Sequence, residues 1–136
     1  LKRIALMIQH IFNNINAQVK VLYEEKQRNR QDRYQIRWTA STGIWEFQNQ
    51  SGFFEQLTAI NTRIPISDWT YIEMIIDTEQ KKILTLDINL ERFTINKYAY
   101  STTAANQYTN AVLYISFVNT IPDEGIALDE IVVEEA

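Results

Sequence analysis

Short runs of alternating apolar and polar residues recur along the whole chain. Tyr71 and Glu73 alternate with Ile72 and Met74, the period of two that places successive side chains on opposite faces of a strand. A second alternating run, at residues 83–88, follows after an Asp-Thr-Glu-Gln turn. That separation is typical of a β-hairpin, so the middle of the chain predicts a pair of antiparallel strands.

The same pattern, separated by short turns rich in Ser, Asn and Gly, predicts a meander of further strands. Residues 97–110 show no sustained period and predict a long surface loop, where binding residues often lie. We find no internal repeat and no linker, so we expect one domain over residues 1–136. The prediction is an all-β antiparallel β-sandwich of about ten strands, with at most one short helix. The further strands are expected at 17–25, 34–39, 44–48, 53–59, 111–118 and 126–134.

The first dozen residues allow two interpretations. Ile4, Leu6 and Ile8 fit one face of a strand, whereas Ile4, Ile8 and Ile11 fit the apolar stripe of a helix. We favour a strand for residues 2–12, because the segment is rich in Ile and everything downstream indicates β structure. The helix remains the alternative.

Three stretches carry a resemblance to a known class of domain. Trp69 followed by the alternating strand 72–77, the strand 84–89, and the closing strand 126–133 with its acidic pair resemble elements of concanavalin A-like or laminin G-like jelly-roll domains. The segments 34–38 and 45–47 are similar to bacterial jelly-roll proteins of unassigned function. The resemblance covers residues 17–135, and it implies a jelly-roll fold rather than a particular activity.

One position departs from that class. Many of its members carry Gly after the Asn of the turn, whereas here Leu90 follows Asn89. We therefore expect this turn not to be of the two-residue Asn-Gly type.

Composition and charge exclude several classes of function. The chain has 136 residues, 46% of them apolar, a net charge of −4 and no cysteine. The absence of cysteine excludes a disulfide scaffold and a thiolate metal site, and it leaves the compartment open, an extracytoplasmic one included. The net negative charge favours solubility and argues against nucleic acid as a partner. No apolar run approaches the ~18 residues that a membrane-spanning helix needs.

Candidates for catalysis and for metal binding are few. Glycosidases of the jelly-roll class use paired carboxylates, and Glu46 and Glu73 are the weak candidates, since they could share a face across neighbouring strands. His10 is the only histidine, which leaves a zinc site or a Ser-His-Asp arrangement without support. We expect no metal site and no cofactor. A structural Ca²⁺ is the alternative, on oxygen ligands from Asp123, Glu124, Asp129 and Glu130.

The faces opposite the predicted core carry the more interesting groups. If Trp38, Ile72 and Leu113 are core residues, parity places aromatic, charged and amide side chains on the opposite face of their strands. Such a mixture suits a polar ligand, and it also suits a protein interface or an ordinary solvated surface. We therefore predict a non-catalytic binding or interaction module, with carbohydrate as the first ligand class to test. The predicted ligand-binding residues are Arg37, Tyr71, Glu73 and Tyr114.

The alternatives to a binding module are a glycoside hydrolase-like enzyme and a purely structural or oligomerisation domain. Leu22, Ile44 and Ile75 fall on the face opposite the predicted core of their strands, and few Gly or Pro residues interrupt the strand edges. We therefore expect a homodimer, or burial against a part of the parent chain that this sequence lacks.

Overall fold

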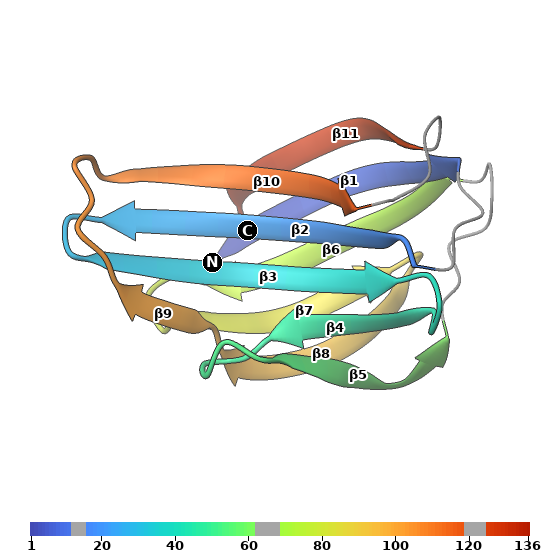
Figure 1. The fold of residues 1–136 in the computed structure, drawn as a ribbon, viewed down its shortest axis with the longest axis horizontal. Helices are drawn as coiled ribbons and strands as arrows, with labels where there is room; N and C mark the ends of the chain where they lie inside the picture. Colours follow the sequence, from blue (N-terminus) through green and yellow to red (C-terminus); the bar gives the residue numbers. More distant parts are fainter. Residues whose placement is uncertain (12–15, 62–68, 119–124) are drawn as a thin grey trace.

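Two antiparallel sheets pack face to face in the computed structural model, which describes residues 1–11, 16–61, 69–118 and 125–136 (Figure 1). The five-stranded sheet has the order β11-β1-β6-β7-β8. The six-stranded sheet has the order β10-β2-β3-β4-β5, and β9 also pairs with β3. The strands are β1 (Lys2–Ile11), β2 (Gln18–Gln27), β3 (Arg30–Thr39), β4 (Ile44–Gln48), β5 (Phe54–Asn61), β6 (Trp69–Asp77), β7 (Lys82–Ile88), β8 (Glu91–Tyr98), β9 (Tyr100–Thr103), β10 (Asn110–Val118) and β11 (Gly125–Glu135).

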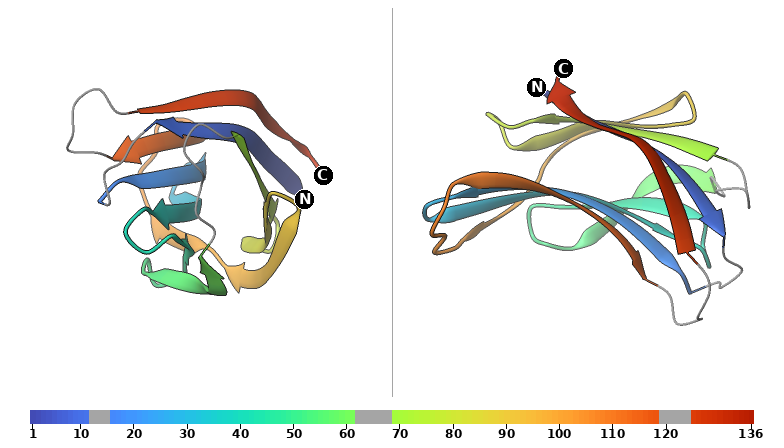
Figure 2. Two further views of the ribbon diagram at one scale, coloured as in Figure 1. Left: turned by 90° about the vertical axis from the view of Figure 1, so that its right-hand side faces the viewer. Right: turned by 90° about the horizontal axis from the view of Figure 1, so that it is seen from above.

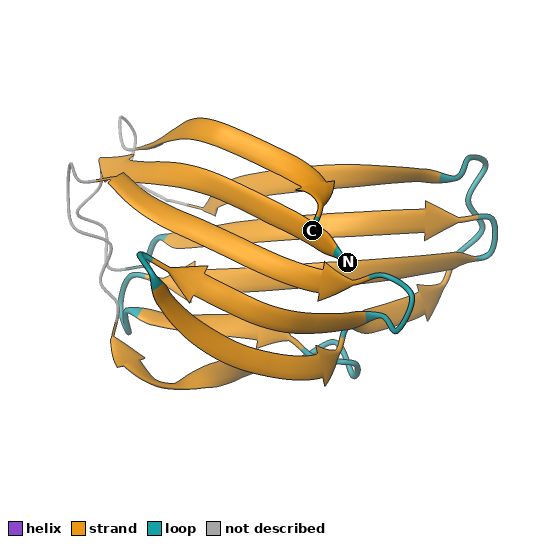
Figure 3. Cartoon of the chain, turned by 180° about the vertical axis from the view of Figure 1, so that it is seen from behind, coloured by secondary structure: helices purple, strands orange, loops and turns teal. Residues whose placement is uncertain are grey.

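The all-β sandwich predicted from the alternation is confirmed. Figure 3 shows strands and turns and no helix in the described part of the chain. The first residues form the strand β1, paired on one side with β6 and on the other with β11, so the helix interpretation of this segment is wrong. The strand order is compatible with a jelly roll.

The chain ends meet at one corner of the sandwich, as Figure 2 shows. The backbone N–H of Ala136 donates to the carbonyl of Leu1 at 3.0 Å, at the end of the β1–β11 pair. The last strand of the chain therefore pairs with the first one at the edge of the five-stranded sheet.

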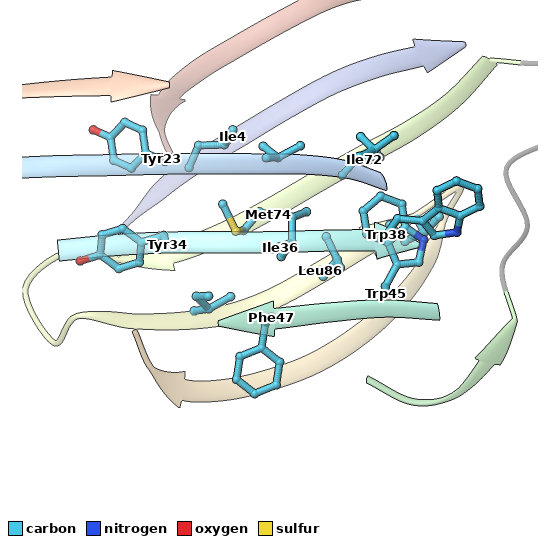
Figure 4. Close-up of a cluster of buried hydrophobic side chains, with 14 of the residues drawn as sticks. Ile4, Tyr23, Tyr34, Ile36, Trp38, Trp45, Phe47, Ile72, Met74 and Leu86 are labelled. Carbon is cyan, nitrogen blue, oxygen red and sulfur yellow. The ribbon is translucent and has the colours of Figure 1, made fainter. Parts of the chain in front are cut away.

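The core lies between the sheets and is built by the predicted alternation. Tyr34, Ile36 and Trp38 of β3 are buried, and they belong to the same cluster as Met74 of β6 and Leu86 of β7 (Figure 4). Strands that are apolar on one face and polar on the other can bury their apolar faces by packing two sheets together. The parity of the strands at 34–39 and 71–76 is therefore confirmed.

The loop predicted at residues 97–110 is wrong for its first half. β8 continues to Tyr98, Ala99 is buried, and the chain then enters β9, which belongs to the other sheet. A strand that crosses between sheets changes its environment within a few residues, so no single period of two survives there. In the described part of the chain, only Ala99 and residues 104–109 of the predicted loop lie outside strands.

The turn between β7 and β8 also differs from the prediction. It contains just two residues, Asn89 and Leu90, and both have positive φ angles, of 47° and 72°. Two consecutive positive φ angles are typical of a type I′ hairpin turn, in which Gly is the usual second residue. The side chain of Asn89 accepts a hydrogen bond of 2.9 Å from the N–H of Tyr71, and its own N–H donates to the carbonyl of Tyr71 at 3.0 Å. These two bonds anchor the turn to β6 and hold Leu90 in the left-handed region.

Replacing Leu90 by glycine is expected to stabilise the protein by about 0.5–1 kcal/mol. The left-handed conformation costs an L-residue roughly 1–2 kcal/mol, and glycine does not incur this cost, although it loses more backbone entropy on folding. Leu90 is 96% exposed, so little burial is lost. Urea unfolding of Leu90→Gly against Leu90→Ala, which keeps the Cβ atom, measures the effect. Equal stability of the two variants contradicts the prediction.

Candidate functional site

The four predicted ligand-binding residues divide between two opposite surfaces. Arg37 on β3 and Tyr114 on β10 lie on the outer face of the six-stranded sheet. Tyr71 and Glu73 on β6 lie on the outer face of the five-stranded sheet. Each side chain has the predicted parity, because its neighbours along the strand face the core, but the core separates the two pairs. The structure therefore does not bring the four residues together.

The candidate carboxylate pair is separated in the same way. Glu46 lies on β4 between the buried Trp45 and Phe47, and Glu73 lies on β6 between the buried Ile72 and Met74. The two carboxylates thus project from different sheets toward opposite sides of the molecule. Two carboxylates must flank one glycosidic bond to hydrolyse it. The expectation that these two residues share a face is wrong, and they cannot form a dyad.

Tyr71 and Glu73 take part in a network that joins three strands. Arg3 donates to the Tyr71 hydroxyl at 3.0 Å and to Glu73 at 3.3 Å, and its Nε donates to Glu134 at 2.8 Å. The Tyr71 hydroxyl donates to Glu73. Desolvation, together with this bond to a carboxylate, raises the pKa of Tyr71. The network links β1, β6 and β11, and its side chains use their polar groups to bind one another.

Arg37 is held from two sides on the opposite surface. Its Nε and Nη2 donate to the same oxygen of Glu46, at 3.1 and 3.0 Å. Its guanidinium carbon lies 3.8 Å from the centre of the Phe54 ring. A cation stacked on an aromatic face and paired with a carboxylate is well fixed, so this edge of the face is rigid.

A hollow of about 370 Å³ lies on the outer face of the six-stranded sheet, over β10, β2 and β3. In Figure 2 (right), β2 and β10 bow so that this outer face is on the concave side of the bend. Leu22 pairs with Tyr114 on one side and with Gln35 on the other, so these three form a row across the hollow. The lining residues are Lys20, Leu22, Glu24, Arg33, Gln35, Tyr114 and Ser116.

The hollow combines one exposed aromatic ring with fixed polar groups. Tyr114 is 42% exposed, whereas Leu22 and Gln35 are buried although they point outward. Glu24 is only 5% exposed, and it accepts a hydrogen bond of 2.8 Å from Gln31. Two cations compensate its charge in ion pairs, Lys26 at 3.5 Å and Arg33 at 3.6 Å. The arrangement provides an apolar floor, a ring at the rim and polar groups held in place.

Sequence reasoning found only part of this hollow. It named Tyr114 on the outer face and placed Leu22 there as a candidate dimer contact, and it did not identify Lys20, Glu24 and Arg33 as lining residues. The signal was available in the β2–β3 hairpin, whose two-residue turn at 28–29 fixes the pairing of Leu22 with Gln35. The basic residues near this turn pair with acidic neighbours: Lys26 and Arg33 pair with Glu24, and Arg30 pairs with Asp32 at 3.0 Å.

A second hollow, of about 300 Å³, lies beside the β4–β5 turn. Its polar groups bind one another: Asn49 accepts from the N–H groups of Ser51 and Phe53, and Lys97 donates to Glu55 at 3.2 Å. Hydrogen bonds from Asn49 and Lys97 lower the pKa of Glu55. The Asn49 bonds stabilise the β4–β5 turn and the Lys97–Glu55 pair links β8 to β5, so these polar groups serve the fold.

The candidate metal ligands do not form a site in the described residues. Asp123 and Glu124 fall outside them, and so does the side chain of His10. Asp129 and Glu130 are exposed on β11. Over residues 1–11, 16–61, 69–118 and 125–136, no group of three or more His, Asp or Glu side chains could hold a metal ion. The same ranges contain no helix long and apolar enough to cross a membrane.

Comparison with known proteins adds no relative. No family model, no curated protein and no solved structure matches the chain.

Proposed function

We propose that the protein is a non-catalytic binding module that holds a carbohydrate in the hollow on the outer face of its six-stranded sheet. The observation that carries the proposal is the row Tyr114, Leu22 and Gln35 across this concave surface. A sugar ring presents apolar C–H groups that pack on an aromatic face, and hydroxyls that need fixed polar partners. Ligand sites generally combine an apolar lining with a few well-placed polar groups in this way.

We also propose that the fold is of the concanavalin A-like, laminin G-like jelly-roll class. A two-sheet antiparallel sandwich with a bowed six-stranded sheet supports it, and the resemblance of the segments around Trp69 and in β11 points in the same direction.

The carboxylates support binding over hydrolysis. Within the described lining of the hollow, Glu24 is the one carboxylate, and Gln31, Lys26 and Arg33 already occupy it. Glu46, farther along the face, is occupied by Arg37. Hydrolysis of a glycosidic bond uses two carboxyl groups on either side of that bond. The hollow offers fixed hydrogen-bonding groups instead.

Tyr114→Ala is expected to weaken carbohydrate binding about tenfold, because the variant loses the stacking surface, and a tenfold change corresponds to ~1.4 kcal/mol. A glycan array identifies the ligand, and isothermal titration calorimetry measures its Kd. Tyr71→Ala is the matched control, because it removes the same side chain from the opposite surface, and its Kd should be unchanged. The proposal is overturned if no glycan binds, or if the control weakens binding as much as Tyr114→Ala.

A further inference from the structure

The sandwich has two long strand edges on the same side, those of β10 and β11 (Figure 1). β10 is the edge of the six-stranded sheet and pairs with β2, and β11 is the edge of the five-stranded sheet and pairs with β1. No strand in the described residues pairs with the second edge of either. Free edges expose backbone N–H and C=O groups, and proteins usually protect them from pairing with other chains.

β11 carries such protection. It contains the acidic residues Asp129, Glu130, Glu134 and Glu135 and no basic residue. Its pairing with β1 shifts register between Ala5 and Met7, where Glu130 has a positive φ of 50°. Charges and bulges both discourage edge-to-edge pairing, and two copies of this strand would place carboxylates opposite carboxylates.

β10 carries no such protection. Its nine residues, NAVLYISFV, include no charge, no proline and no glycine. Of the four edge strands eight residues or longer, β5, β8, β10 and β11, the others all contain charged residues. Its core-facing Leu113 and Ile115 are only partly buried, and Tyr114 and Val118 are exposed. An uncharged edge of high β-propensity pairs readily with another strand.

We propose that a second copy of this chain covers this edge, with β10 pairing antiparallel to β10 of its partner about a two-fold axis at Tyr114. A two-fold axis perpendicular to the sheet keeps core-facing residues opposite core-facing residues only if it passes midway between the two copies of one residue. Tyr114 is the residue that lets all nine positions pair. The partner residues are then Asn110 with Val118, Ala111 with Phe117, Val112 with Ser116, Leu113 with Ile115, and Tyr114 with itself.

This pairing suits a second copy because it is self-complementary. Leu113 meets Ile115 on the core side, and no like charges face each other along the strand. β11 lies on the same side, so the two β11 strands approach each other in the dimer. Their exposed Leu128, Ile131 and Val133 add apolar area, while their carboxylates repel. Added salt screens this repulsion and tightens the dimer.

The dimer deepens the proposed function without depending on it. The outer faces of the two six-stranded sheets become one continuous surface, with the two Tyr114 rings adjacent at its centre and a hollow on each side. A ligand long enough to occupy both hollows would bind with the avidity of two linked sites.

Single cysteines test the register, because the natural chain has none. Directly opposed residues in an antiparallel pair have Cα atoms about 4.5–5.5 Å apart, within the range a disulfide spans. Tyr114→Cys is expected to give a disulfide-linked dimer of twice the 16.0 kDa chain mass under mild oxidation. Val112→Cys alone should remain unlinked, because residue 112 of one copy lies ~13 Å from residue 112 of the other. A mixture of Val112→Cys and Ser116→Cys should link.

Light scattering of the unmodified chain, from micromolar to millimolar concentration and at low and high salt, gives the second measurement. A dimer that strengthens with salt, together with the cross-linking pattern above, supports the proposal. A monomer at every concentration overturns it, and so does a dimer in which Val112→Cys links with itself or Tyr114→Cys does not link. Neither readout involves a sugar, so failure of the dimer and failure of carbohydrate binding are separate results.

Discussion

Replacing Leu86 by alanine is expected to lower the free energy of unfolding by about 3–5 kcal/mol. Leu86 lies on β7 with no exposed surface, in the cluster that joins the two sheets (Figure 4). Truncating a buried leucine removes the transfer free energy of three carbon atoms and leaves a cavity that the close-packed surroundings fill only in part.

Leu90→Ala is the matched control, because it makes the same chemical change at a side chain that is 96% exposed. Its unfolding free energy should change by no more than ~0.5 kcal/mol. Urea unfolding followed by tryptophan fluorescence measures both variants. A comparable loss in both would show that residue 86 is not part of the core.

Ser101→Ala is expected to lower the free energy of unfolding by about 1.5–3 kcal/mol, far more than the same substitution at an ordinary serine on a short strand. Its hydroxyl donates to Asp32 at 2.6 Å, and Asp32 is only 1% exposed. The same oxygen of Asp32 accepts from Arg30 at 3.0 Å, and its other oxygen lies 3.8 Å from the ammonium group of Lys81. Loss of a hydrogen bond to a buried charged group is more costly than loss of a neutral one.

The contribution of the Asp32 charge to this loss of stability can be measured in the Asp32→Asn variant. In Asp32→Asn the acceptor is no longer charged, so Ser101→Ala should cost less there, and the difference measures the coupling between the two side chains. Ser116→Ala, at an exposed serine on β10, is the control and should be neutral within ~0.5 kcal/mol. Equal costs in both backgrounds would contradict a role for the carboxylate. Hydrogen exchange of β9 amides should quicken in Ser101→Ala, since this bond joins β9 to β3.

β9 was predicted as loop because its strand conformation depends on β3 and on the Asp32–Ser101 bond, and not on its own residue pattern. Residues 100–103, YSTT, carry three small hydroxyl side chains and no apolar alternation, so nothing local marks them as a strand. They are strand because β3 offers a free edge there and Asp32 a buried acceptor. The Asn89–Leu90 turn is a similar case: Leu is a poor residue for positive φ, and the bonds from Asn89 to β6 hold the turn in that conformation.

By itself the sequence determined most of the strands, and the apolar face of those that alternate regularly. The period of two places Tyr34, Ile36 and Trp38 on one face and Arg37 on the other wherever the strand ends up, because successive side chains on a strand must point to opposite sides. From this, the all-β class and most of the core followed.

Only the tertiary structure decided which sheet each strand joined. The parity of Arg37, Tyr71, Glu73 and Tyr114 was right, yet β3 and β10 lie in one sheet and β6 in the other, so one expected site became two separate surfaces. Alternation shows that a side chain points away from the core, but a sandwich has two such faces. Sheet membership depends on strand pairings between residues far apart in the chain, as when β1 lies between β6 and β11. Local residue patterns do not identify the partner strands, because the packing of the two apolar faces as a whole selects them.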